Sequence, residues 1–332
     1  MPVAEASLPA RPARVAGRGA LLSRYGTLAA LALLLLFNFA ITPNFATWQT
    51  LNVNLTQVAT IVIVAVGMTL VIATGGIDLS VGSLMAISGA LAPLIFLGQL
   101  FPLPHLYVGV GLAFVVPVLV AGVFGLFNGW MITRFRIQPI VATLVLFIAG
   151  RGIAQALTDA NLQIFQVPEF QFIAIGRVLG IPVQVIIMAV NVAMAAWAIR
   201  RTVFGRQVLA VGGNEAAARL AGVPVARVKR SVYAISGLCA GVAGLIVIAR
   251  NSASDANLVG LGMELDAIAA VAVGGTPLTG GRADIVGTLI GAMIIQLVRY
   301  TLLANGVPDA AALVVKAGII VVAVWLRRPS RV

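Results

Sequence analysis

Charged residues, histidine and cysteine are all scarce in this sequence. Asp, Glu, Lys and Arg make up only 10% of the 332 residues, whereas soluble domains carry roughly 25%. The single cysteine, Cys239, excludes an intrachain disulfide and a cysteine-based metal centre. With His105 as the only histidine, no His-rich metal set and no Ser/His/Asp constellation stands out. The scarcity therefore argues against metal, redox and hydrolytic chemistry.

Lysine is scarcer still, since Lys229 and Lys316 are the only two among 22 basic residues. A nucleotide-binding P-loop needs the pattern G-x-x-x-x-G-K-(S/T), in which the lysine contacts phosphate. Neither lysine follows a glycine. We therefore predict that the chain is not an enzyme, does not hydrolyse ATP by itself and holds no cofactor.

Hydrophobic residues are abundant, at 61% of the chain with a mean hydropathy of +1.07. A globule this apolar has lipid as its natural solvent, and a helix needs about 20 apolar residues to cross the hydrocarbon core. The sequence predicts an all-α, polytopic membrane protein in which one transmembrane domain, 21–328, follows a disordered basic tail, 1–20. Its ten predicted segments are 21–41, 57–74, 79–97, 106–130, 139–157, 181–199, 231–249, 263–273, 285–303 and 310–326.

The net charge of +12 does not indicate nucleic acid binding, because the basic residues form short clusters between apolar runs. Cytoplasmic loops of membrane proteins are enriched in Lys and Arg. With a cytoplasmic N-terminus, ten crossings put 17 of the 22 basic residues inside and leave only Arg177 and Arg250 in outside loops. The distribution predicts that both termini are cytoplasmic. The inside set is Arg11, Arg14, Arg18, Arg24, Arg134, Arg136, Arg200, Arg201, Arg206, Arg219, Arg227, Lys229, Arg230, Arg282, Arg327, Arg328 and Arg331.

Two glycine-rich breaks interrupt the apolar segments. Residues 75–82 and 274–281 both read G-G-x-x-L-(S/T)-x-G. Transporters often contain repeats with glycine-broken helices near the substrate pathway, so the match is consistent with an internal repeat. Two independent tight turns, in which glycine supplies positive φ, explain it equally well. The predicted turn residues of the second break are Gly274, Gly275, Gly280 and Gly281.

Four acids lie in or beside the apolar segments: Asp78, Glu264, Asp266 and Asp284. A charge within the bilayer is costly, so such residues mark a pathway, a pairing or a helix end. Asp78 and Asp284 can cap the helices that follow them, and Glu264 and Asp266 can be interfacial. The polar residues predicted to line a substrate pathway are Asn54, Thr74, Gly75, Gly76, Asp78 and Ser80.

The basic loop 200–230 contains the sharpest functional signal. Asn214 is a good N-cap, the next six residues favour helix, and Gly222 and Pro224 end it. A membrane protein needs such a rigid element if a soluble partner is to move it; an ordinary interfacial helix is the alternative. The predicted coupling residues are Gly213, Asn214, Glu215, Ala216, Ala217, Arg219 and Gly222.

Several motifs, in the right order and spacing, resemble those of the permease subunit of ribose-type bacterial ABC sugar importers. They are 66–70 leading into 75–83, the loop 212–222, the run 264–271 and the turn 274–281. The resemblance covers residues 42–325, and 137–155 and 254–271 are most similar to the galactofuranose-type branch. One departure concerns the coupling motif, in which Gly222 follows Glu215 by seven positions rather than the more familiar six.

The resemblance implies an inner-membrane permease that works in pairs, either as a homodimer or with a paralogue. Its partners would be cytoplasmic subunits that bind ATP and magnesium, and a periplasmic sugar-binding protein. The expected function is alternating-access import of a pentose or furanose sugar, although similar permeases carry other small polar solutes. Two rivals remain: an ion-coupled transporter in which Asp78, Glu264 and Asp266 carry protons, and a pore without energy coupling.

Overall fold

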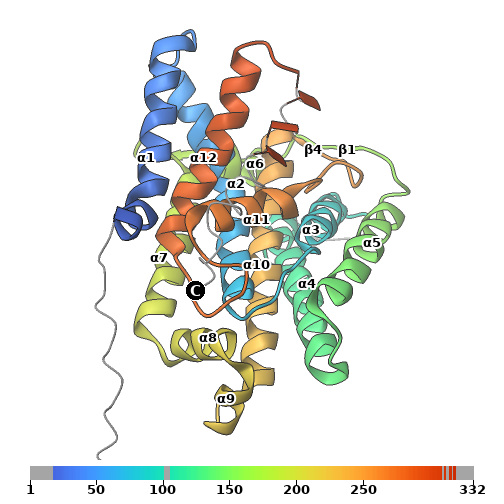
Figure 1. The fold of residues 1–332 in the computed structure, drawn as a ribbon. Helices are drawn as coiled ribbons and strands as arrows, with labels where there is room; N and C mark the ends of the chain where they lie inside the picture. Colours follow the sequence, from blue (N-terminus) through green and yellow to red (C-terminus); the bar gives the residue numbers. More distant parts are fainter. Residues whose placement is uncertain (1–17, 101–104, 309, 312–313, 316, 319–332) are drawn as a thin grey trace, which may run out of the picture.

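The computed structural model describes residues 18–100, 105–308, 310–311, 314–315 and 317–318, and the described chain is overwhelmingly helical (Figure 1). Four two-residue strands form two small antiparallel pairs, β1 with β4 and β2 with β3. The helices are α1 (Arg18–Ile41), α2 (Trp48–Ala73), α3 (Val81–Phe96), α4 (Leu106–Phe135), α5 (Pro139–Leu157), α6 (Pro168–Ile175), α7 (Val183–Arg201), α8 (Val203–Gly213), α9 (Glu215–Leu220), α10 (Val225–Asn251), α11 (Met263–Gly274) and α12 (Ile285–Ala304). The strands are β1 (Gln163–Ile164), β2 (Arg177–Val178), β3 (Ile181–Pro182) and β4 (Ala253–Ser254).

The predicted fold class is confirmed, and the first nine predicted segments each overlap one helix. Within the described residues, six helices are long and apolar enough to cross a membrane: α2, α4, α5, α7, α10 and α12. The helices α3 and α11 are shorter, at 16 and 12 residues, than the roughly 20 that a crossing needs. The tenth predicted segment, 310–326, lies largely outside the described residues, as does the predicted tail up to residue 17.

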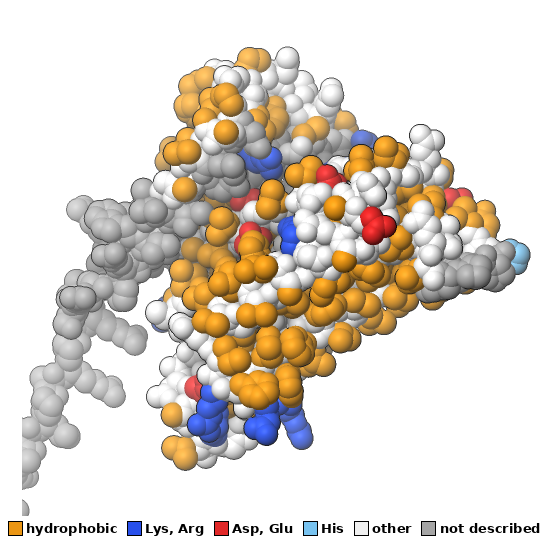
Figure 2. All heavy atoms as spheres, turned by 90° about the vertical axis from the view of Figure 1, so that its right-hand side faces the viewer, with side chains coloured by type: hydrophobic (Ala, Val, Ile, Leu, Met, Phe, Trp, Pro, Cys, Tyr) orange, Lys and Arg blue, Asp and Glu red, His pale blue; other side chains and the backbone are white. Residues whose placement is uncertain are grey.

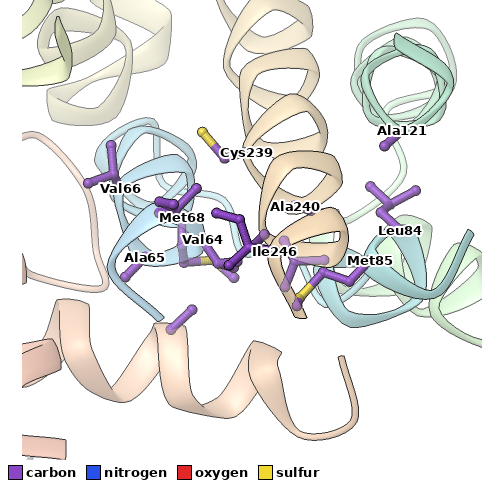
Figure 3. Packing of buried hydrophobic residues seen from close by; sticks show 14 of the residues in the cluster. Val64, Ala65, Val66, Met68, Leu84, Met85, Ala121, Cys239, Ala240 and Ile246 are labelled. Carbon is purple, nitrogen blue, oxygen red and sulfur yellow. The ribbon is translucent and has the colours of Figure 1, made fainter. Parts of the chain in front are cut away.

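The core is centred on α10, which packs against α2, α3 and α4. Figure 3 shows α10 between the other three, with Ile246 of α10 beside Val64 of α2. Nearly all side chains of α3 and of the second half of α2 are buried. By contrast, α4, α5 and α7 leave large apolar side chains exposed, such as Val145 and Trp197. An apolar outer surface is the pattern expected of helices whose solvent is lipid.

Two helices were not predicted from the sequence. The stretch 158–180 lies between two predicted segments, but α6 within it buries Phe170 completely, with its ring centroid 5.0 Å from Phe96 and 5.1 Å from Phe114. In the loop 200–230, α8 precedes the expected helix. Thr202 caps α8 by accepting a hydrogen bond from the Gly205 N–H at 3.2 Å.

The contact between α4 and α10 is the most extensive helix pairing in the described chain and depends on small residues. A Cβ at Gly125 of α4 would overlap the carbonyl oxygen of Tyr233 and lie 3.2 Å from Cα of Gly237. Small residues allow backbones to approach in this way, which is how helices in membranes gain packing energy. The backbone of α10 is therefore held directly against that of α4.

This packing predicts opposite outcomes for two substitutions on α4. Gly125→Ala forces a methyl group into backbone atoms, and overpacking of this kind costs about 1–3 kcal/mol. Gly111 has no atom within 4 Å of an added Cβ, so Gly111→Ala should not lower stability and can raise it slightly, because alanine favours helix more than glycine does. Thermal unfolding in detergent should show a lower Tm for Gly125→Ala only. Equal Tm values for the two variants would contradict the close approach.

Candidate functional site

Asp78 lies in the non-helical segment between α2 and α3 and is fully buried. Its Oδ1 accepts hydrogen bonds from the Ser80 backbone N–H at 3.0 Å and from the Ser80 hydroxyl at 2.6 Å. Its Oδ2 accepts a hydrogen bond from the Ser236 hydroxyl of α10 at 2.8 Å. Both carboxylate oxygens thus have partners, and they join the break to the central helix.

The same hydrogen-bond network reaches α4 and α5. The Asn128 amide of α4 donates to the Ser80 hydroxyl at 2.9 Å. The Ser83 hydroxyl donates to the Leu146 carbonyl of α5 at 3.0 Å. We call Asp78, Ser80, Asn128 and Ser236 the buried polar cluster. Neither Asn128 nor Ser236 was predicted, and the only signal for them was a polar side chain inside an apolar segment.

The structure corrects the expectation that Asp78 is itself the cap of the following helix. Ser80 occupies the N-cap position of α3, without a side-chain cap bond. Asp78 acts two residues earlier, by accepting the Ser80 N–H. Asp284, in contrast, caps α12 as predicted, since its Oδ1 accepts from the Gly287 N–H at 2.8 Å.

The predicted pathway residues do not form one group. Thr74, Gly76, Asp78 and Ser80 are buried together at the break, while Gly75 is exposed. Asn54 lies 20 residues before Thr74 along α2, a distance of roughly 30 Å in a helix that rises 1.5 Å per residue. There Asn54 lines a largely apolar cavity of about 520 Å³ between α1, α2 and α12.

A second polar cluster surrounds the start of α11. Glu264 and Asp266 are 7% and 8% exposed, so both side chains are buried within the protein. The Oε2 atom of Glu264 is buried without a hydrogen-bond partner. Nearby, Arg151 of α5 donates to the carbonyl oxygens of Ala256 at 2.8 Å and Val259 at 2.6 Å. Arg151 was not predicted as a functional residue, although a charge inside an apolar segment is such a signal.

The predicted coupling segment, residues 213–222, contains the short helix α9. Asn214 caps it by accepting the Ala217 N–H at 3.0 Å, as the sequence predicts. Ala216 and Ala217 occupy its first turns, Ala218 is buried and Leu220 is 91% exposed. Gly222 ends the helix with φ of +81°, a conformation that glycine adopts without strain. Gly213 is the last residue of α8 and has no positive φ.

Glu215 anchors α9 to the start of α10. Its carboxylate accepts from Lys229 at 2.6 Å and from Arg219 at 3.1 Å. The hydrogen bond from Lys229 is the largest cause that lowers the pKa of Glu215 below its ordinary value. The carboxylate therefore stays charged at neutral pH, and both ion pairs persist.

Basic residues gather at the end of the molecule where α8 and α9 lie. Figure 2 shows Lys and Arg side chains at this lower end and a broad apolar surface above them. The Arg230 guanidinium donates to the Thr133 hydroxyl at 2.9 Å, which brings the start of α10 beside the end of α4, where Arg134 and Arg136 lie. Basic residues assigned to one side from the sequence are thus neighbours at one end of the fold.

The second glycine break forms the turn between α11 and α12. Gly275 has φ of +105° at the C-cap of α11, and Gly280 and Gly281 have φ of +88° and +79°. Gly274 packs against the backbone of Gly287, 13 residues later.

Within the described residues, no group of three or more His, Cys, Asp or Glu side chains is placed to hold a metal ion.

Comparisons with known proteins match most of the chain. The family model described as "Branched-chain amino acid transport system / permease component" matches residues 50–324. The ribose import permease protein RbsC of Escherichia coli (strain K12) is 41% identical over 303 residues, 90% of this chain and 91% of that protein. The galactofuranose transporter permease protein YtfT of the same organism is 39% identical over 88% of this chain and 86% of its own length. The L-arabinose ABC transporter permease protein AraH of Azospirillum brasilense is 36% identical over 85% and 80%. No solved structure matches.

The buried polar cluster predicts a graded effect of substitutions at Asp78. Asp78→Ala leaves the Ser80 N–H and the Ser80 and Ser236 hydroxyls without their acceptor. Each buried group left unpaired lowers the stability of the fold by about 1–3 kcal/mol. Asp78→Asn keeps Oδ1 and should cost less. Thermal unfolding in detergent should rank wild type above Asn and Asn above Ala. An alanine variant as stable as wild type would show that the cluster does not hold the break together.

Proposed function

Because the chain belongs to the family of branched-chain amino acid transport system permease components, we propose that it imports a monosaccharide of the pentose or furanose type. The observation that carries the substrate class is the 39–41% identity, over about nine-tenths of the chain, to permeases named for ribose and galactofuranose. As a permease subunit, the chain is not an enzyme, and a separate subunit hydrolyses ATP. A related permease is named for L-arabinose.

The proposed partners bind at opposite ends of the molecule. A cytoplasmic ATP-binding subunit docks on α9, at the basic end, and a periplasmic sugar-binding protein docks at the end that carries β2 and β3. A second permease, identical or paralogous, completes the pathway. Support for the orientation comes from the charge distribution, since basic loops face the cytoplasm. In this arrangement the chain spans the bacterial inner membrane with both termini inside.

The sugar crosses the membrane by making weak and reversible polar contacts with residues of the path. Uncharged sugars need hydrogen-bond donors and acceptors rather than a fixed charge. The residues proposed to line or shape the path are Asn54, Thr74, Gly75, Gly76, Asp78 and Ser80. In the described conformation Asp78 and Ser80 are enclosed by α4 and α10, so they shape the path rather than line it. Alternating access exposes the path itself to one side of the membrane at a time.

Reconstitution tests the proposal directly. Vesicles that contain the permease with its ATP-binding subunit should take up radiolabelled ribose, arabinose or another monosaccharide only when the binding protein is outside and ATP is inside. The same vesicles should not respond to a proton gradient alone. Gradient-driven uptake by the permease without an ATPase would favour an ion-coupled transporter instead. ATP-driven uptake of a solute other than sugars would keep the mechanism and change the substrate.

Leu220 provides a sharp test of the docking end. It is a large apolar side chain, 91% exposed, at the end of α9, and burial of a leucine contributes about 1.5–3 kcal/mol. Leu220→Glu should therefore weaken binding of the ATP-binding subunit at least about tenfold, which corresponds to ~1.4 kcal/mol. Pull-down or light-scattering titration in detergent measures this affinity.

Leu179 is the matched control, since it is 97% exposed and lies between β2 and β3, at the opposite end of α7 from α8. Leu179→Glu adds the same charge in place of the same side chain. It should leave binding of the ATP-binding subunit unchanged. Equal losses from the two substitutions would contradict the proposed docking end, and so would no loss from Leu220→Glu.

A further inference from the structure

Both glycine breaks meet the end of α8 in one place. The Gly281 N–H donates a hydrogen bond to the carbonyl oxygen of Ala73, the last residue of α2, at 3.0 Å. A Cβ at Gly212 would overlap that same carbonyl oxygen and lie 2.6 Å from the Gly281 nitrogen. A Cβ at Gly280 would lie 2.8 Å from the nitrogen of Gly75 and 3.1 Å from the oxygen of Gly212. We call these five residues the glycine junction.

The glycine junction joins three backbones without intervening side chains. The first is the end of α2, the second the turn between α11 and α12, and the third the last turn of α8. A contact between backbones has no rotatable side chain that could absorb a displacement, and close-packed interiors transmit strain. A movement of α8 by a fraction of an ångström therefore has to move the two breaks with it.

The junction is also adjacent to α9. Asn214 alone separates α8 from α9, and its side chain caps α9. The ion pairs of Glu215 with Lys229 and Arg219 hold α9 in its orientation. At the other end of the junction, Asp78 of the buried polar cluster follows Ala73 by five positions in the sequence. A short, stiff connection thus runs from the basic end of the molecule to the buried break.

We propose that the glycine junction is the point at which movement of α9 passes to the transmembrane helices α2 and α12. This inference rests on the proposed function, in which a cytoplasmic ATP-binding subunit moves α9. Gly212 is the central positioning residue, since its missing side chain lets α8 touch both breaks. A displacement of α8 then shifts the end of α2 and the start of α12 together, which changes access to the path between them.

Gly212→Ala tests the junction, because its methyl group must separate α8 from Ala73 and Gly281. Alanine favours helix more than glycine does, so any loss comes from the contact and not from a weaker α8. Ala210→Ser is the matched control: it also adds one heavy atom to α8, at an exposed position. Both variants are assembled with the ATP-binding subunit and binding protein in nanodiscs for ATPase rates, and in vesicles for sugar uptake.

For Gly212→Ala we expect an assembled complex whose basal ATPase activity is retained. Stimulation by the sugar-loaded binding protein, and sugar uptake, should fall at least about tenfold, a change of ~1.4 kcal/mol in coupling. Ala210→Ser should behave as wild type. Full stimulation and uptake in Gly212→Ala would overturn the inference while leaving the proposed function intact. A wild-type complex without ATP-dependent uptake would overturn the proposed function, and the inference with it.

Hydrogen exchange in the wild-type complex keeps the inference testable if Gly212→Ala does not assemble. On addition of a non-hydrolysable ATP analogue, peptides that carry residues 73–76 and 278–283 should change their exchange rates together with the peptide that carries 212–222. A peptide from the seam between α4 and α10, around Gly125, should stay unchanged. A response of 212–222 with no change at the two breaks would overturn the inference.

Discussion

Lipid offers no hydrogen bonds to the backbone, so wherever a helix is interrupted inside the membrane the protein must supply the missing partners. The segment between α2 and α3 interrupts the helices and is buried within the protein, so its backbone also needs protein partners. Asp78 accepts the Ser80 N–H at 3.0 Å. The Ile77 carbonyl accepts from Tyr233 of α10 and Thr143 of α5, both at 3.4 Å. The break therefore requires α5 and α10 beside it, and those contacts bring short α3 into the core.

Two contacts between backbones, each made possible by a glycine, serve two different functions. At Gly125, backbone contact with Tyr233 of α10 locks α4 and α10 into one unit. At Gly212, backbone contact with Ala73 and Gly281 links a helix at the basic end to two breaks. Large apolar side chains, by contrast, are left on the surface of α4, α5 and α7, where lipid replaces protein at little cost. Rigid contacts inside and replaceable contacts outside allow parts of the molecule to move as units within the membrane.

The sequence predicted the membrane helices well, because hydropathy reports directly on the solvent that each segment meets. The bounds of α5, for example, agree with the predicted 139–157. Asn214 likewise predicted α9, since capping is local. The buried polar cluster could not be predicted from the sequence, because Ser236 lies 158 residues from Asp78 along the chain. The helix α8 was missed because Gly212 and Gly213 resemble a helix stop, whereas glycine here permits a close approach between segments far apart in the chain.

The shared pattern of the two glycine breaks now has a physical explanation that does not need a common origin. Aligned by sequence, Gly75 pairs with Gly274; aligned by structure, Gly75 pairs with Gly275, one position later. Both of these residues have positive φ, and in each case the next N–H bonds a carbonyl five residues back, Gly76 to Val71 and Thr276 to Val271. The two breaks share a helix-ending geometry and contact each other, so each needs glycine for its own turn and for the close approach between them.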